Sequence, residues 1–268
     1  MTASTSLVQR RDYLDGQRRT IIARSVMASF AGAVPLPFLD DWAVTSILGR
    51  GYRKLAAAHQ VDVSDDAVTN LVHGTSKPPS LTEIAAGGIA FRLASRAARR
   101  MLLALATVKR ARGAARTFVT MTLFDHYCAK LHRGLAIDAA TALALRDEIS
   151  RAIDQTPGAL AFHPFRRGVL SAARATMRAP LELADLASRG ALRRMLARRA
   201  GGDVTDGERV DEMEQAMEAV LADKNGFLAR TVAAVEVQLS SEVNPFLDAA
   251  IEALDRRWRA RVAAGVVP

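Results

Sequence analysis

The sequence has a single cysteine, Cys128, among its 268 residues, and only 5% of its residues are aromatic. One cysteine cannot form an internal disulfide, so the class of secreted domains held together by disulfides is excluded. The scarcity of aromatic side chains argues against binding of single-stranded nucleic acid by base stacking. Because Cys128 has apolar neighbours, we expect it to be a small buried hydrophobic residue.

Long hydrophobic runs are also absent. A membrane-spanning helix needs about 20 consecutive apolar residues, and the apolar stretch 21–39 is interrupted by Arg24 and ended by Pro35 and Pro37. We favour a core helix followed by a packed proline turn over a segment that lies in a membrane interface. The stretch starts too far into the chain, and its flanks are too poor a cleavage site, for a signal peptide. We expect a cytoplasmic protein, and peripheral attachment to the inner membrane stays open.

Recognisable catalytic motifs are missing. The sequence has no Walker A loop, no G-x-S-x-G, no H-E-x-x-H and no C-x-x-C. His126 and His132 are six residues apart, so they face different sides of a helix and cannot jointly hold a metal. We therefore predict no catalytic residue, no metal and no cofactor. We interpret the histidines as isolated surface or core residues; they are His59, His73, His126, His132 and His163.

Helical periodicity runs through almost the whole chain, and alternating β-branched runs are scarce. The pattern predicts an all-α fold, a multi-helix bundle of about nine or ten helices with short loops. We expect residues 1–268 to form one helical domain, with articulations at 74–80 and 200–205. We expect Ser64 to cap a helix over 65–73 and Gly113 to separate two helices. Further helices are expected over 138–155, 227–242 and 245–263.

Two segments, 52–68 and 127–142, share a loose outline. Each has an aromatic residue, a basic patch, a Val/Ile–Asp pair and a following helix. Their registers differ by a residue or more, so the sequence leaves a duplication open.

Charge is distributed unevenly along the chain. The formal net charge is +9, and the abundance of Ala and Arg fits a GC-rich bacterial genome. Residues 84–124 contain eight basic residues and no acidic one, 155–199 contain nine arginines, and 203–223 contain eight acidic residues. At about 100° per residue, several arginines fall on one side of a continuous helix. The predicted binding residues for an anionic partner are Arg92, Arg96, Arg99, Arg110, Arg193 and Arg194.

Two interpretations of this charge compete. The acidic helix 206–223 could pack on the basic helices and neutralise them. Alternatively, an arginine face stays exposed and meets anionic lipid, where each basic residue contributes about 1 kcal/mol, or an acidic partner protein. Nucleic acid is the weaker candidate, because duplex binding would rest on charge alone.

Asp40 and Asp41 follow the turn that contains Pro35 and Pro37, and we regard these four residues as a candidate functional turn. Adjacent carboxylates could bind a cation or act in acid–base chemistry. We favour the simpler interpretation that they cap a helix and complement its dipole. An enzyme built around these two residues and His59 remains a further hypothesis, with no reaction to assign.

The segment Pro35-x-Pro37-x-x-Asp40, followed by Tyr52-Arg-Lys-Leu-Ala and by His59-Gln-Val-Asp-Val-Ser, resembles the YcjF-like and EcsC-like bacterial helical families. The resemblance covers residues 25–72, under a fifth of the chain. Phe38-Leu39 stand where the families have glycine, and His59-Gln60 where an aromatic-Gly pair is common. The resemblance implies a membrane-associated bacterial protein that accompanies a Ras-like GTPase or a transport system. The families have no established catalytic residues to carry over.

The sequence therefore favours a non-enzymatic accessory or scaffold protein at a membrane surface, whose basic amphipathic helices meet anionic lipid or an acidic partner protein. The alternatives are a nucleic-acid-associated basic helical protein and an enzyme of unknown reaction around Asp40 and Asp41.

Overall fold

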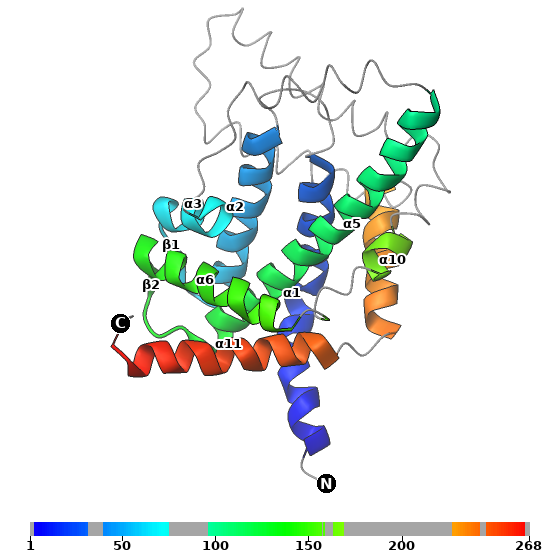
Figure 1. Ribbon diagram of the computed structural model, residues 1–268. Coiled ribbons are helices and arrows are strands. Elements are labelled where there is room, and N and C mark those ends of the chain that lie inside the picture. Colours follow the sequence, from blue (N-terminus) through cyan, green and yellow to red (C-terminus); the bar gives the residue numbers. More distant parts are fainter. Residues whose placement is uncertain are drawn as a thin grey trace, which may run out of the picture.

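The computed structural model describes residues 3–31, 40–74, 96–156, 158, 163–168, 227–241 and 245–265 (Figure 1). Of these, 87% are helical, which confirms the all-α class. The helices are α1 (Ala3–Ala31), α2 (Asp40–Ala58), α3 (Asp65–His73), α5 (Arg96–His126), the π-helical turn η1 (Tyr127–Leu131), α6 (Ala139–Gln155), α10 (Phe227–Ser241) and α11 (Pro245–Ala263), and the two short strands are β1 (Asp62–Val63) and β2 (Ala136–Ile137).

The centre of the core is α1, which packs on α2, α5 and α10. Every residue from Ile21 to Ala28 is buried, so this part of the predicted apolar stretch is a core helix and not an interfacial one. Arg24 is inside the core as well, and its Nη1 donates to the carbonyl of Ile47 at 2.8 Å. The hydrogen bond gives one donor of this buried charged group an acceptor, which reduces the cost of placing the group there. No described helix combines the length and the apolar character that crossing a bilayer requires.

The two segments with a shared outline adopt matching structures and lie side by side. β1 and β2 pair in parallel, with Asp62 opposite Ala136, ten residues after Tyr52 and nine after Tyr127. Each tyrosine packs edge-on against another ring, Tyr52 on Phe124 and Tyr127 on the Trp258 indole. A capped helix follows each strand, α3 after β1 and α6 after β2. The structure therefore gives both segments a helix–strand–helix arrangement.

The predicted cap on Ser64 is present, and Asp138 caps the helix that begins at Ala139. The Ser64 side chain accepts a hydrogen bond from the backbone N–H of Ala67 at 3.2 Å, and Asp138 accepts one from Thr141 at 2.7 Å. These bonds satisfy N–H groups that the first helical turn leaves without partners. The C-terminal helices were predicted correctly to within one residue. The prediction at Gly113 was wrong, because α5 continues through it from Arg96 to His126. Residues 169–199 of the arginine-rich segment and the acidic helix predicted over 206–223 lie outside the described residues.

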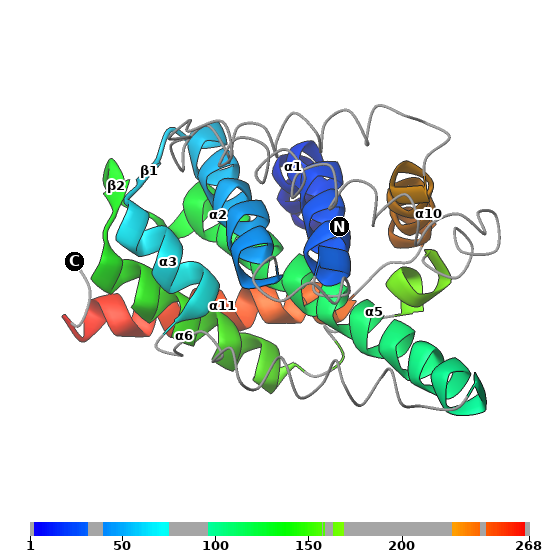
Figure 2. The ribbon, with the colours of Figure 1, turned by 90° about the horizontal axis from the view of Figure 1, so that it is seen from above.

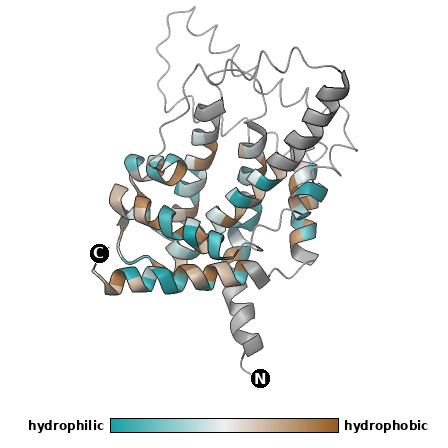
Figure 3. Ribbon diagram, viewed as in Figure 1, coloured by the Kyte–Doolittle hydropathy of each residue, from teal (hydrophilic) through white to brown (hydrophobic). Residues whose placement is uncertain are grey.

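Helix α11 lies across α6 and the C-terminal end of α5 (Figures 1 and 2). Both α6 and α11 alternate between hydrophilic and hydrophobic residues along their length (Figure 3). Their apolar positions face the core, among them Leu145, Ile149 and Leu254. This crossing also brings polar side chains from helices far apart in the sequence into contact.

Candidate functional site

The structure describes only some of the residues predicted to bind an anion or to form the candidate functional turn. Arg96, Arg99 and Arg110 lie along α5, which keeps these three on one helix. The other predicted positions lie outside the described residues; they are Arg92, Arg193, Arg194, Pro35 and Pro37.

Asp40 and Asp41 begin α2, whereas His59 directly follows its last residue, Ala58. A helix of 19 residues is about 28 Å long at 1.5 Å per residue. The backbone of α2 therefore places Asp40 and Asp41 at the opposite end of the helix from His59.

His59 instead contacts a carboxylate from the other half of the fold. Its Nε2 lies 2.8 Å from Oδ1 of Asp125, which is fully buried, whereas the histidine ring is partly exposed. Oδ2 of Asp125 has no hydrogen-bond partner among the described residues. Burial raises the pKa of Asp125, and the hydrogen bond and charge of His59, with the charge of His126, oppose that rise. The buried carboxyl of Asp125 thus holds its proton more readily than an exposed aspartic acid does.

The next residue, His126, links three helices. Its Nδ1 lies 2.5 Å from the hydroxyl of Tyr13 on α1, and its Nε2 lies 2.6 Å from Oδ1 of Asp255 on α11. Hydroxyl, imidazole and carboxylate stand in the order that serves proton transfer in hydrolase triads. In this protein the imidazole is buried, so its evident effect is to tie α1, α5 and α11 together. The Lys130 ammonium lies 5.0 Å from the centre of the Tyr13 ring.

A third contact follows where α5 becomes the π-helical turn η1. The hydroxyl of Tyr127 lies 3.1 Å from Nδ1 of His132, and burial lowers the pKa of this histidine. π-helical turns are frequent at functional sites. The neighbouring Cys128 is buried, as predicted, and its burial raises the pKa of the thiol, which disfavours a reactive thiolate.

The histidines are therefore not isolated, and that interpretation was wrong for His59, His73, His126 and His132, each of which contacts a polar side chain. The partners of His59 and His126 come from distant parts of the chain, which local patterns do not reveal. Within the described ranges, no three His, Cys, Asp or Glu side chains are grouped so that they could hold a metal ion.

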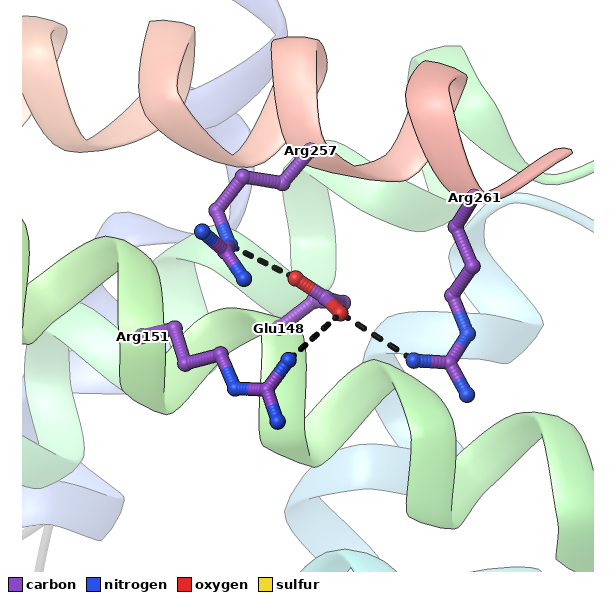
Figure 4. A network of polar contacts seen from close by, with 4 residues as sticks. All are labelled: Glu148, Arg151, Arg257 and Arg261. Atoms are coloured by element: carbon purple, nitrogen blue, oxygen red, sulfur yellow. Dashed lines mark hydrogen bonds and ion pairs between the residues drawn. The ribbon is translucent and has the colours of Figure 1, made fainter. Parts of the chain in front are cut away.

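A second polar cluster lies where α11 crosses α6, and Figure 4 shows it from close by. Oε2 of Glu148 accepts a hydrogen bond from Nε of Arg257 at 2.6 Å. Its Oε1 accepts from Nη1 of Arg261 at 3.1 Å and from Nη1 of Arg151 at 3.5 Å. Glu148 is only 5% exposed. One buried carboxylate thus holds three guanidinium groups, which leaves a local excess of positive charge. We call Glu148, Arg151, Arg257 and Arg261 the arginine cluster.

Sequence reasoning overlooked the arginine cluster. Arg257 and Arg261 are four residues apart and so share one face of a helix, as do Glu148 and Arg151, three apart. These spacings were the available signal. They gave no indication that the two faces would meet.

Exposed apolar and basic residues lie at one end of the molecule. Leu135 precedes β2 and is 83% exposed, and Val262 near the end of α11 is also exposed. The loop before β2 and the C-terminal end of α11 lie at the same end in both views (Figures 1 and 2). Arg133 and Arg259 are exposed in the same two segments. We call Arg133, Leu135, Arg259 and Val262 the tip surface.

The chain matches no protein-family model, no curated protein and no solved structure. The fold itself therefore defines the class: an all-α protein in which two matching segments pair through β1 and β2. In the part of the chain that the structure describes, it carries an arginine cluster around a buried carboxylate and an exposed apolar and basic tip.

Proposed function

We propose that the protein is an accessory or scaffold protein that binds peripherally to an anionic membrane surface, and that its tip surface makes the contact. The observation that carries this proposal is Leu135, a large apolar side chain left 83% exposed beside the exposed Arg133. Insertion of an exposed Leu among lipid acyl chains is favourable because it removes apolar surface from water. The neighbouring arginine would meet lipid phosphates. A single exposed apolar residue is ordinary in itself, so its support for the proposal comes from the basic residues around it.

The expected membrane contact is shallow. Apolar insertion by Leu135 and Val262 would be combined with attraction between anionic headgroups and Arg133 and Arg259. Acidic residues also lie at the tip: Oδ2 of Asp255 is 3.5 Å from Nη2 of Arg259, and the backbone N–H of Asp62 donates to the Leu135 carbonyl at 2.8 Å. Their charges would weaken the attraction. We propose that the whole protein is a bundle of nine or ten helices. In this bundle the arginines of α5 would add to the long-range attraction between the protein and the anionic membrane.

Flotation with vesicles tests this proposal. The protein should float with vesicles of phosphatidylcholine and phosphatidylglycerol and stay behind with phosphatidylcholine alone. Leu135→Asn should weaken flotation about tenfold, the equivalent of about 1.4 kcal/mol of lost apolar contact. Val237→Asn is the matched control, because Val237 is 64% exposed on α10, at the opposite end of the molecule (Figure 1).

Equal effects of the two substitutions, or no flotation of the unmodified protein, would overturn the proposal. Duplex DNA is added as a competitor. If DNA reverses flotation and Leu135→Asn has no effect, the basic surface binds nucleic acid. If the protein neither floats nor binds DNA, an acidic partner protein becomes the leading alternative, such as the GTPase or transport component that the family resemblance implies.

A further inference from the structure

The geometry of the arginine cluster points to a binding site for a phosphate monoester, and we propose that Arg151, Arg257 and Arg261 bind its dianion. Three guanidinium groups around one carboxylate leave an excess of two positive charges. A phosphate monoester carries about −1.5 to −2 charges at neutral pH, so its charge complements that of the cluster.

The arginines have unused hydrogen-bond donors. A guanidinium group has five N–H donors, and each arginine of the cluster gives only one of them to Glu148. Nε of Arg261 is buried and has no acceptor among the described residues. A buried N–H without an acceptor is costly, so the contact with Glu148 alone leaves the Arg261 guanidinium group incompletely satisfied. Arginine is well suited to this role because its planar fork of donors matches the phosphate oxygens.

The cluster is both preorganised and accessible. Glu148 is buried and holds the arginines before any ligand arrives, which lowers the entropy cost of ordering three long side chains on binding. Arg151 is 58% exposed, and Arg257 and Arg261 are about one quarter exposed, so an ion can reach them from solvent. Figure 4 shows the guanidinium groups approaching Glu148 from both helices, α6 and α11.

Neutralising Glu148 does not explain the cluster. One bidentate arginine would satisfy a buried carboxylate, whereas like charges brought together on one helix face repel each other. Arg257 and Arg261 occupy one face of α11, and Arg151 adds a third positive charge opposite them. A dianion would remove this repulsion.

Titration with inorganic phosphate at constant ionic strength tests the site, with binding measured by calorimetry and by the shift in the thermal midpoint. The double variant Arg257→Gln/Arg261→Gln should bind phosphate about tenfold or more weakly, because it loses charge-assisted hydrogen bonds. The control Arg256→Gln/Arg259→Gln removes the same charge from the same helix and should bind within about twofold of the unmodified protein, since diffuse attraction is screened by salt. Equal losses in the two double variants, or no binding by the unmodified protein, would overturn the proposal.

A second comparison allows for unfolding of the first variant, in which the buried Glu148 keeps only Arg151 as a partner. Glu148→Gln/Arg257→Gln/Arg261→Gln removes that charge, and Arg256→Gln matches its net change of one unit. Loss of phosphate binding in the folded triple variant alone supports the site, and retention of binding overturns it.

Vesicles identify the source of the phosphate. Phosphatidic acid carries a phosphate monoester, whereas phosphatidylglycerol carries a diester. A preference for phosphatidic acid that disappears in Arg257→Gln/Arg261→Gln would assign the site to a lipid headgroup. Binding of inorganic phosphate without that preference would assign it to a soluble phosphate compound. Leu135→Asn should leave inorganic phosphate binding unchanged, so failure of the membrane proposal and failure of this site are distinguishable.

Discussion

Nε2 of His59 lies 2.8 Å from Oδ1 of Asp125, 66 positions further along the chain. The carboxylate is fully buried, and its other oxygen has no partner among the described residues. Burial raises the pKa of Asp125 above 3.8, its ordinary value, despite the contact with His59. The folded protein therefore holds this proton more tightly than the unfolded chain does.

This relationship predicts the pH dependence of stability. A raised carboxyl pKa means that the stabilisation is fully present below about pH 4 and is lost as the pH rises through the folded-state pKa. Asp125→Asn removes this titration. The free energy of unfolding of the unmodified protein, minus that of the variant, should therefore decrease as the pH is raised from about 4, as measured by urea unfolding at several pH values.

Asp138 provides the control of opposite sign. Its hydrogen bonds to the backbone and side chain of Thr141 lower its pKa, so its stabilisation is present above about pH 4 and is lost as the pH falls below that. The corresponding difference for Asp138→Asn should be smallest in acid. A difference for Asp125→Asn that is independent of pH, or that rises with pH, would contradict the assignment.

The link between Tyr13 and His126 predicts a loss of stability on removing one hydroxyl group. Tyr13→Phe leaves Nδ1 of the buried His126 without this contact, which should cost about 1–3 kcal/mol of unfolding free energy. Chemical denaturation measures this loss. The control is Lys130→Gln, which removes the ammonium group above the same ring and should cost less than about 1 kcal/mol. Equal effects of the two substitutions would show that the hydroxyl–imidazole contact contributes little.

Two glycines inside helices should respond in opposite directions to substitution by alanine. At Gly51, an added Cβ would lie 2.5 Å from Cε of Met121 and 2.8 Å from Cδ of Arg24, so Gly51→Ala overpacks the junction of α1, α2 and α5. We expect a loss of about 1–3 kcal/mol. At Gly113 the nearest atom would be Oγ of Ser29 at 3.7 Å, so Gly113→Ala should raise stability by up to about 1 kcal/mol.

Thermal unfolding of both variants checks this pair. A stable Gly51→Ala protein would mean that Met121 and Arg24 can move aside. A destabilised Gly113→Ala protein would mean that the helix bends at Gly113 in a way that alanine cannot follow.

Local sequence signals determined several of the helix ends. Ser64 and Asp138 cap helices because a side-chain oxygen satisfies backbone N–H groups only a few residues away, and Pro245 starts α11 because proline fits the first helical turn. These effects act within one turn, so they can be recognised without knowledge of the fold. Gly113 misled the prediction because its weak helix propensity, about 1 kcal/mol, is outweighed by the burial of neighbouring residues such as Ala114 and Ala115.

Only the tertiary structure decided which polar groups meet. Tyr13 and His126 are 113 positions apart, and Glu148 and Arg257 are 109 apart. No periodicity in the sequence relates such residues, because their contact depends on how α1, α5, α6 and α11 pack. The sequence by itself determined an all-α chain rich in arginine. Helix packing decided that three of those arginines share one buried carboxylate. Apolar surface is buried, and a buried charge finds its partners, only when whole helix faces come together.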